Sequence, residues 1–165
     1  MADLDPALRT PTDLSRNETQ TVADALNGAL ADCYALYLKT KNFHWHVSGP
    51  HFRDYHLMLD DQATQIIGVT DAIAERVRKT GNATLRSIGD ISRRSRIIDN
   101  DREFVHASDM LTELREDNLK LVERFRTVKQ AAEDAGDNAT SGIVDEWTDQ
   151  AEERAWFLFE VGRKG

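Results

Sequence analysis

Apolar side chains recur at helical intervals along four long stretches of the chain. The first stretch begins where the residues S-R-N-E, at 15–18, predict a capping box between Ser15 and Glu18, and it extends to about His46. The residues V-S-G-P at 47–50 then predict a short turn. The side chains predicted to be buried lie on one face of this helix: Val22, Leu26, Leu30, Cys33, Tyr37 and, beside them, Tyr34.

The second stretch predicts one amphipathic helix that starts at Phe52 and ends near Gly81 and Asn82. Large apolar residues recur in it at seven-residue intervals, a spacing that keeps them on one helix face. This stripe is therefore predicted to be core. Its members are Phe52, Leu59, Ile66 and Ile73.

A long connection separates this helix from the last two. Residues 82 to about 107 show no sustained period, so they predict a crossover, with a short helix near 88–98. Ser108 is predicted to cap a third helix that ends near Ala135 and Gly136, and a fourth helix is predicted at about 140–161. The inward positions of these two helices are predicted to be Leu111, Leu114, Leu121, Val122, Phe125, Val128, Ile143, Trp147, Ala151, Ala155, Leu158 and Phe159. The pattern therefore predicts an all-α fold, a four-helix bundle with one long crossover in the middle.

Composition limits the classes of protein that fit this fold. A chain of 165 residues is long enough for one core, and residues 15–165 are predicted to form a single domain behind a flexible arm at 1–14. The net charge of −8 disfavours a surface built for DNA phosphates and favours one that attracts cations. The single cysteine, Cys33, excludes an intrachain disulfide and favours the cytoplasm. No leader or membrane-spanning run is recognisable, which predicts a soluble protein.

A second stripe, beside the core stripe of the helix predicted from Phe52, carries ionisable side chains. Two of its pairs are spaced four residues apart, which can place both members of a pair on one cation. The pairs lie about 16 Å apart along the helix axis at about 1.5 Å per residue, so one ion cannot bind both within one helix. The stripe consists of His56, Asp60, Ile67, Asp71 and Glu75.

The ionisable stripe has the same residue spacing in both directions. The outer pair, His56 and Glu75, has its midpoint between positions 65 and 66. The inner pair, Asp60 and Asp71, has the same midpoint. Two copies of the helix packed antiparallel about a two-fold axis at that point would complete each half-site with residues of the other copy. The alternative interpretation is a solvated acidic flank that contains a histidine by chance.

Three motifs in this region carry a family resemblance. They are K-x-x-H-W-x-V-x-G-P-x-F from Lys41, x-x-H-x-x-L-D up to Asp60, and D-x-I-A-E-R from Asp71. Together they resemble the Dps family (DNA-binding protein from starved cells), a branch of the ferritin-like superfamily. The resemblance is strong over about 44–76, and the rest of the chain matches only as a helical pattern. It implies that the bundle is ferritin-like.

The resemblance also implies a ferroxidase site between two subunits. One subunit would supply His44, His56 and Asp60, and its two-fold mate would supply Asp71 and Glu75. Imidazole and carboxylate ligands suit Fe(II), Mn(II) or Zn(II), and the resemblance selects iron. It further implies a hollow dodecameric shell that oxidises Fe(II), preferably with hydrogen peroxide, stores the ferric product and protects against oxidative stress.

Five further residues are weaker candidates. His46 and His51 predict either an auxiliary metal site or support for the main site, and local hydrogen bonding is the favoured alternative. Asp145, Asp149 and Glu152 lie on one face of the fourth predicted helix. This arrangement favours a solvated surface, whereas the resemblance implies that acidic residues near a symmetry axis line an iron-entry pore.

DNA binding, which gives the resembling family its name, often depends there on a lysine-rich terminal arm. Residues 1–16 contain no lysine, and the basic clusters are R-R-S-R at 93–96 and G-R-K-G at 162–165. Each cluster favours a salt-bridge role over a DNA contact. Weak or absent binding to DNA is therefore expected. The rival hypothesis is a DNA-compacting protein of the nucleoid in which iron chemistry is secondary.

Overall fold

Helices form all the regular secondary structure of the computed structural model, which describes residues 4–163. No strand occurs in this range, so the predicted all-α fold is confirmed. None of the helices there is both long and apolar enough to cross a membrane. In chain order, the elements are the 3₁₀ turn η1 (Pro6–Leu8) and the helices α1 (Arg16–His46), α2 (Phe52–Gly68), α3 (Thr70–Lys79), α4 (Ile88–Arg94), α5 (Ala107–Asp134) and α6 (Asn138–Val161).

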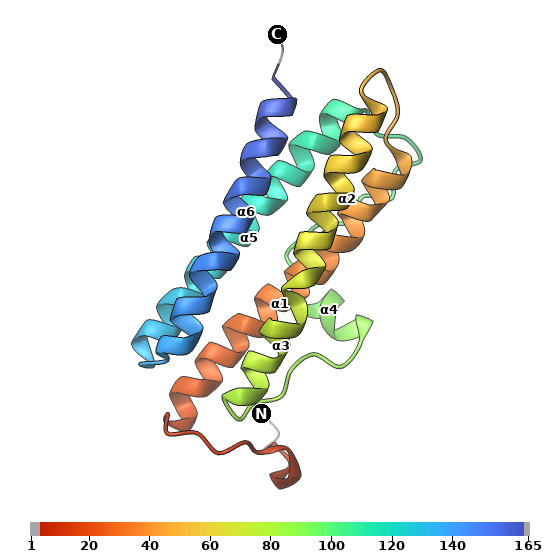
Figure 1. The fold of residues 1–165 in the computed structure, drawn as a ribbon. Helices are drawn as coiled ribbons and strands as arrows, with labels where there is room; N and C mark the ends of the chain where they lie inside the picture. The colour runs from red at the N-terminus through yellow and green to blue at the C-terminus, as the bar shows by residue number, and fades with distance from the viewer. Residues whose placement is uncertain (1–3, 164–165) are drawn as a thin grey trace.

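Two helical hairpins form a four-helix bundle (Figure 1). In the first hairpin α1 packs against α2 and α3, and in the second α5 packs against α6. The chain leaves α3 at the end of the bundle where the N-terminal arm lies, and enters α5 at the opposite end. The connection between them, which includes α4, therefore runs along the bundle. The predicted crossover and its short helix are confirmed.

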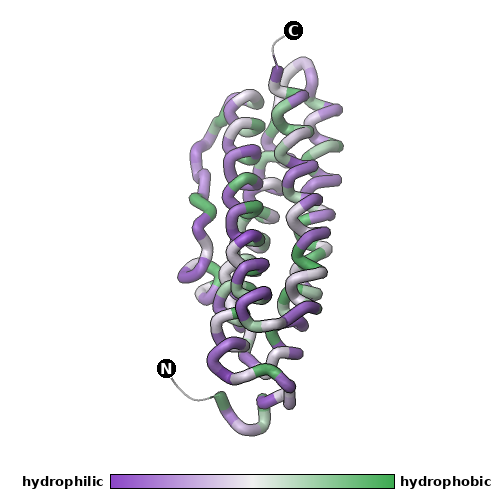
Figure 2. The backbone as a smooth tube through the Cα atoms, turned by 90° about the vertical axis from the view of Figure 1, so that its left-hand side faces the viewer, coloured by the Kyte–Doolittle hydropathy of each residue, from purple (hydrophilic) through white to green (hydrophobic). Residues whose placement is uncertain are grey.

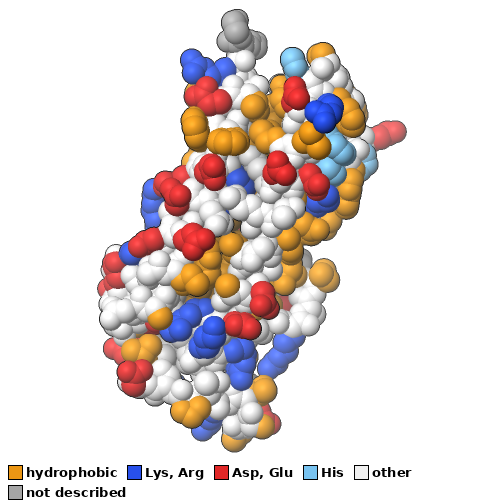
Figure 3. Space-filling model, in the orientation of Figure 1, with side chains coloured by type: hydrophobic (Ala, Val, Ile, Leu, Met, Phe, Trp, Pro, Cys, Tyr) orange, Lys and Arg blue, Asp and Glu red, His pale blue; other side chains and the backbone are white. Residues whose placement is uncertain are grey.

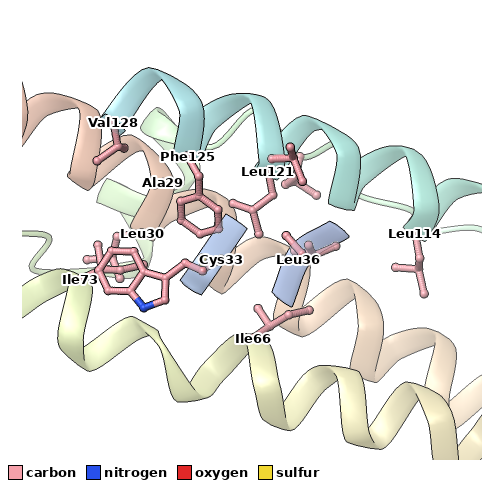
Figure 4. Close-up of a cluster of buried hydrophobic side chains, with 14 of the residues drawn as sticks. Ala29, Leu30, Cys33, Leu36, Ile66, Ile73, Leu114, Leu121, Phe125 and Val128 are labelled. Atoms are coloured by element: carbon pink, nitrogen blue, oxygen red, sulfur yellow. The ribbon is translucent and has the colours of Figure 1, made fainter. Parts of the chain in front are cut away.

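An apolar core runs along the inside of the bundle, and Figure 4 shows side chains from several helices meeting there. Figure 2 shows hydrophobic and hydrophilic positions alternating along the helices, as expected when each helix buries one face. Most predicted core positions are confirmed. Buried as predicted are Val22, Leu26, Leu30, Cys33, Leu59, Ile66, Ile73, Leu111, Leu114, Leu121, Val122, Phe125, Val128, Trp147, Ala151, Ala155 and Leu158.

Three predicted core positions are wrong. Phe52 is 45% exposed because it is the first residue of α2, where no preceding helical turn covers it. Ile143 and Phe159 are also exposed, since each lies one position beside the buried stripe of α6. That stripe passes through Val144 and Leu158 instead. Tyr34 and Tyr37 are half-buried against the core.

The helix predicted to start at Phe52 is interrupted once, so the prediction of a single uninterrupted helix is wrong. Val69 separates α2 from α3 but keeps a near-helical conformation, with φ −92° and ψ −12°. The Thr70 hydroxyl donates to the Ile67 carbonyl at 2.7 Å. Gly68 and the two β-branched residues after it are weak helix formers, which accounts for the break. Because Val69 stays near-helical, α3 continues in the direction of α2 (Figure 1).

The helix starts show one correct and one wrong capping prediction. Ser15 Oγ accepts from the Glu18 backbone N–H, while Glu18 accepts from the Ser15 backbone N–H, so the predicted capping box is confirmed. The predicted cap at Ser108 is wrong because α5 begins at Ala107, with His106 as its N-cap two residues earlier than predicted. Ser108 therefore already lies inside the helix.

Asp32, fully buried in α1, fixes the crossover and α5 to the first hairpin. Its Oδ1 accepts from the backbone N–H of Arg96 at 2.6 Å. Its Oδ2 accepts from Nε of Arg124 at 2.8 Å and from Nε of Arg96 at 3.5 Å. In the same basic cluster, Arg93 pairs with Asp90. The cluster at 93–96 thus supplies salt bridges within the chain, one of them at the surface and the other to the buried Asp32, whereas its sequence favoured a surface or intersubunit role.

The described part of the N-terminal arm lies against the end of the bundle where α3 ends. Asp5 caps η1, and the Leu8 carbonyl accepts a hydrogen bond from Arg78. Gly81 has a φ of +80°, and a Cβ there would lie 2.7 Å from the Thr10 carbonyl oxygen, so this close approach requires glycine. The flexibility expected of residues 1–14 stays a prediction, and residues 1–3 lie outside the described range.

Candidate metal centre

The turn between α1 and α2 brings two predicted ligands together. The rings of His44 and His56 stack with centroids 3.8 Å apart and an angle of 19° between their planes. His44 is only 7% exposed, while His56 is half-buried. Figure 3 shows histidine side chains at this end of the molecule, close to acidic and basic side chains. The hairpin geometry therefore places the two imidazoles side by side, one buried and the other half-buried.

Reciprocal hydrogen bonds fix the orientation of the two rings. His44 Nδ1 lies 2.7 Å from the carbonyl oxygen of His56, and His56 Nδ1 lies 2.9 Å from the carbonyl oxygen of His44. A carbonyl oxygen can only accept, so each Nδ1 must carry the proton. In the neutral rings, each Nε2 then keeps a free lone pair. This is the tautomer that a metal-binding histidine needs, with its other nitrogen held by a backbone carbonyl.

Asp60, one turn after His56 on α2, adds a carboxylate to the pair. Its Oδ1 lies 3.9 Å from His44 Nε2 and accepts a 2.6 Å hydrogen bond from Lys41 Nζ. The Lys41 hydrogen bond lowers the pKa of Asp60 below its ordinary value, and the charge of Lys41 acts in the same direction. Asp60 is therefore an ionised ligand candidate that already has a cationic partner.

The other two predicted ligands lie elsewhere on the chain. Asp71 and Glu75 are exposed on α3, and Glu75 accepts from Lys79 at 3.2 Å in a contact within the helix. The structure does not bring them to the histidine pair. Within residues 4–163, no three His, Cys, Asp or Glu side chains are grouped so that they could hold a metal ion. One chain thus presents the predicted ligands as two separate sets.

Arg76, the residue after Glu75, ties α3 to the start of α6. Its Nη2 donates to Asp137 Oδ1 at 2.8 Å and its Nε donates to Thr140 Oγ1 at 2.7 Å. Asp137 is the N-cap of α6 and also accepts from the Thr140 backbone N–H at 3.0 Å. Burial raises the pKa of Asp137, but the hydrogen bonds from Thr140 and Arg76 outweigh it and lower that pKa below its ordinary value. The exposed carboxylates of α3 therefore stand on a well-anchored helix.

The weaker candidates all lie at the surface. His46 Nδ1 donates to the carbonyl oxygen of Asn42 at 2.7 Å, one turn earlier in α1. His51 is the N-cap residue of α2, where its side chain makes no capping hydrogen bond, and its ring lies 5.7 Å from that of Tyr55. Both histidines are exposed and neither hydrogen-bonds to the His44–His56 pair, so local contacts describe them.

The acidic candidates on α6 are exposed, and two of them form ion pairs with α5. Asp145 accepts from Lys129 at 2.8 Å, and Glu152 accepts from Arg126 at 2.8 Å. Asp149 is exposed on the same helix. Within the chain, two of these carboxylates therefore link the helices of the second hairpin.

Two residues of the site were missed by sequence reasoning. Lys41 belongs to the first quoted motif, three residues before His44, but nothing in the sequence indicates that it reaches Asp60. Arg76 ends the third motif, yet its partner Asp137 lies 61 positions away. In both cases the sequence shows a basic residue near a proposed ligand. Its partner can be identified only from the folded structure.

Comparisons with known proteins agree with this architecture. Residues 23–164 match the model of a ferritin-like domain. The DNA protection during starvation protein of Halobacterium salinarum is 34% identical over 145 residues, which cover 86% of this chain and 78% of that protein. The protein of the same name from Agrobacterium fabrum is 31% identical over 150 residues, covering 91% and 93%. The crystal structure of an archaeal Dps homologue from Halobacterium salinarum superposes with a TM-score of 0.87 at 28% identity, covering 98% and 87% of the two chains.

Proposed function

The chain belongs to the Dps branch of the ferritin-like family, and on that premise we propose that it is an iron-storing mini-ferritin that oxidises Fe(II) between two subunits. The observation that carries this proposal is the His44–His56 pair. Its reciprocal hydrogen bonds direct both Nδ1 protons to backbone carbonyls and leave two Nε2 lone pairs free, with His44 Nε2 3.9 Å from Asp60 Oδ1. This arrangement is better explained by a site for a divalent cation than by a solvated flank with a chance histidine.

The remaining ligands come from a second copy of the chain. A two-fold axis between positions 65 and 66 brings Asp71 and Glu75 of one copy to His56 and Asp60 of the other. The exposure of Asp71 and Glu75 in the single chain supports this arrangement, because exposed carboxylates remain available to a partner. Closure of such dimers into a dodecameric shell, with the ferric product stored inside, follows the family resemblance.

The chemistry proposed for the site is a two-electron reduction of hydrogen peroxide by two ferrous ions. Each Fe(II) loses one electron, the O–O bond breaks, and two protons from solvent complete two water molecules. Carboxylates stabilise the higher charge of the ferric product, and the neutral imidazoles hold the ferrous substrate through Nε2. Consuming both Fe(II) and peroxide in one step protects DNA and protein from oxidative damage.

Iron is proposed to enter the shell through acidic pores and to be handled in the cytoplasm. Asp145, Asp149 and Glu152 are the candidates for the pore lining, and metal ions would have to compete there with Lys129 and Arg126. The alternative function is compaction of DNA at the nucleoid, and the relatives that are called DNA protection during starvation proteins connect the family with DNA. The net charge of −8 and the lysine-free segment 1–16 oppose it.

Ferrous oxidation by mixed mutants tests the proposed site. Asp60→Ala and Glu75→Ala each remove one ligand and little core volume, so each protein should assemble but lose most rapid oxidation. In a heterodimer of the two, one site lacks both carboxylates and the other site is intact. Shells dissociated and reassembled from the two inactive proteins should regain about half of the wild-type rate per heterodimer. Verified mixed assembly without recovered oxidation would defeat the two-chain site.

A gel shift separates the two functions. If the protein stores iron and does not compact DNA, it should retard duplex DNA weakly or not at all at physiological salt, because its net negative charge repels the phosphates. Retardation that persists at moderate salt would favour the DNA-compacting alternative. The ferrous titration, run with hydrogen peroxide and with dioxygen in turn, identifies the oxidant.

A further inference from the structure

We propose that Lys41 is a built-in competitor for the iron-binding carboxylate of Asp60, and that a divalent cation must displace its ammonium group from Asp60 Oδ1. This inference rests on the proposed function, since it concerns the same site. It gives Lys41 a positioning role, in which the lysine sets the iron concentration at which the site fills.

The competition follows from the atoms that meet at Asp60. Its Oδ1 is the carboxylate oxygen nearest to His44 Nε2, at 3.9 Å, and it is also the oxygen that Lys41 Nζ holds at 2.6 Å. A nitrogen and an oxygen bonded to one tetrahedral metal ion at about 2.0–2.2 Å each lie roughly 3.5 Å apart, close to the separation of these two atoms. A cation that bridges His44 and Asp60 therefore takes the position at Oδ1 that the ammonium group occupies.

The Lys41–Asp60 contact is poorly suited to a purely structural role. The side chain of Lys41 is 18% exposed and that of Asp60 is 50% exposed. An ion pair with a half-exposed partner is screened by water on that side, so it contributes less to folding than a fully buried network does. Asp32 offers the contrast, since its fully buried carboxylate joins three segments of the chain. The Lys41 contact is therefore distinguished by its place at a proposed ligand atom, not by its contribution to stability.

A second contact gives the displaced ammonium group a place to remain. Lys41 Nζ lies 5.8 Å from the centre of the Trp45 ring, within the range of a cation–π interaction. Trp45 is 58% exposed on the same helix, so the ring face can be reached from solvent. Lys41 can therefore leave Asp60 while it keeps its contact with Trp45. A metal ion can displace the ammonium group without any unfolding of α1.

Binding of Zn²⁺, which does not change oxidation state, tests the competition apart from catalysis. Isothermal titration of the assembled protein should give Lys41→Met an affinity about two- to fivefold higher than wild type, the size expected for removing one partly exposed ion pair. Lys41→Arg keeps the charge and should bind Zn²⁺ as the wild type does. Lys120→Met removes the same charge on α5, where Lys120 pairs with Asp117, and should also leave the affinity unchanged.

Chemical labelling supplies a second readout. Saturating Zn²⁺ should speed acetylation of Lys41, measured by peptide mass spectrometry, while the rate at Lys120 stays constant. An unchanged or weaker Zn²⁺ affinity in Lys41→Met, or an unchanged rate at Lys41, overturns the inference. Asp60→Ala separates this failure from that of the proposed function. If Asp60→Ala binds Zn²⁺ as wild type does, Asp60 is no ligand and both proposals fail, whereas loss of binding there leaves the site standing.

Discussion

The two sets of proposed ligands are held in different ways. His44 and His56 fix each other through backbone carbonyls, so the nitrogen ligands are preorganised within one chain. Asp71 and Glu75 make no such contacts and project from α3, which Arg76 ties to the start of α6 on the opposite side. The orientation of the two histidines is thus fixed by their own hydrogen bonds. The positions of Asp71 and Glu75 depend instead on the placement of α3.

This difference shows where precision is needed. A neutral imidazole offers one lone pair in the plane of its ring, so the ring must be oriented before a metal ion arrives. A carboxylate offers two oxygens with several acceptor directions and tolerates a less exact placement. A site assembled from two copies can therefore fix the histidines within one copy and bring the carboxylates with the other.

The largest effect is expected at the proposed two-fold axis, where the two copies would touch. Ile67 lies next to the proposed axis and is only partly buried within the chain, so Ile67→Lys should place an unpaired charge in the interface. A loss of about 3–5 kcal/mol of dimer stability, with loss of oxidation, is expected and can be measured by light scattering and ferrous titration. Thr127→Lys, at an exposed position of α5, is the control. A fully assembled, active Ile67→Lys shell would contradict the axis. Ile66 is unsuitable because it is fully buried within the chain.

The next effect concerns the nitrogen set alone. His56→Gln removes an imidazole lone pair and one of the two reciprocal hydrogen bonds, so rapid oxidation should fall at least about 100-fold, since even supporting residues of metal sites cost about 10–100-fold. Stopped-flow absorbance after ferrous addition measures it. His51→Gln lies at the start of the same helix and should stay within about twofold of wild type. Equal losses in both variants would remove the distinction between the paired and the local histidines.

A smaller effect is expected from loosening the anchor of the carboxylate set. Asp137→Ala deletes the cap of α6 and the partner of Arg76, and should cost about 0.5–2 kcal/mol of folding free energy, measured by urea unfolding. Asp137→Asn retains an oxygen for the cap and should cost less at pH 7.

The same anchor predicts a pH dependence. Because the folded pKa of Asp137 lies below its ordinary value of 3.8, its ionised form stabilises the fold above that value, and this stabilisation is lost as the pH falls further. Wild-type stability should therefore decline more steeply below about pH 4 than that of Asp137→Asn. Parallel pH profiles would show that the charge of Asp137 does not anchor α3.

The smallest effect is expected at His46. Its ring is exposed and bonded to the Asn42 carbonyl of its own helix, so His46→Asn should change Zn²⁺ affinity and ferrous oxidation by no more than about twofold. A tenfold loss of Zn²⁺ affinity would instead make His46 part of the metal centre.

Much of the fold could be predicted because periodicity reports burial directly. The stripe of Leu59, Ile66 and Ile73 is predicted correctly, since each lies inside a helix on the face that meets the core. The pattern failed for Phe52 because a residue at the first turn of a helix lacks that cover. It missed the break at Val69 because one near-helical residue scarcely alters the period.

The ligand candidates could be predicted for a different reason, since their motifs place residues at fixed spacing. The spacing does not specify the partners that lie far away along the chain. Lys41 reaches Asp60 only because the hairpin closes, and Arg76 reaches Asp137 only because α6 returns beside α3. The contribution of the second copy remains a prediction, for which the Asp60 and Glu75 mixing experiment is the test.

The buried carboxylate of Asp32 has a consequence for the order in which the chain can fold during translation. Helices α1 to α3 leave the ribosome first, yet the guanidinium of Arg124 that neutralises Asp32 follows 92 positions later. Until it arrives, native packing of α1 would enclose a carboxylate without its full set of partners, which is strongly unfavourable. Native packing of the first hairpin is therefore expected only after α5 has been synthesised.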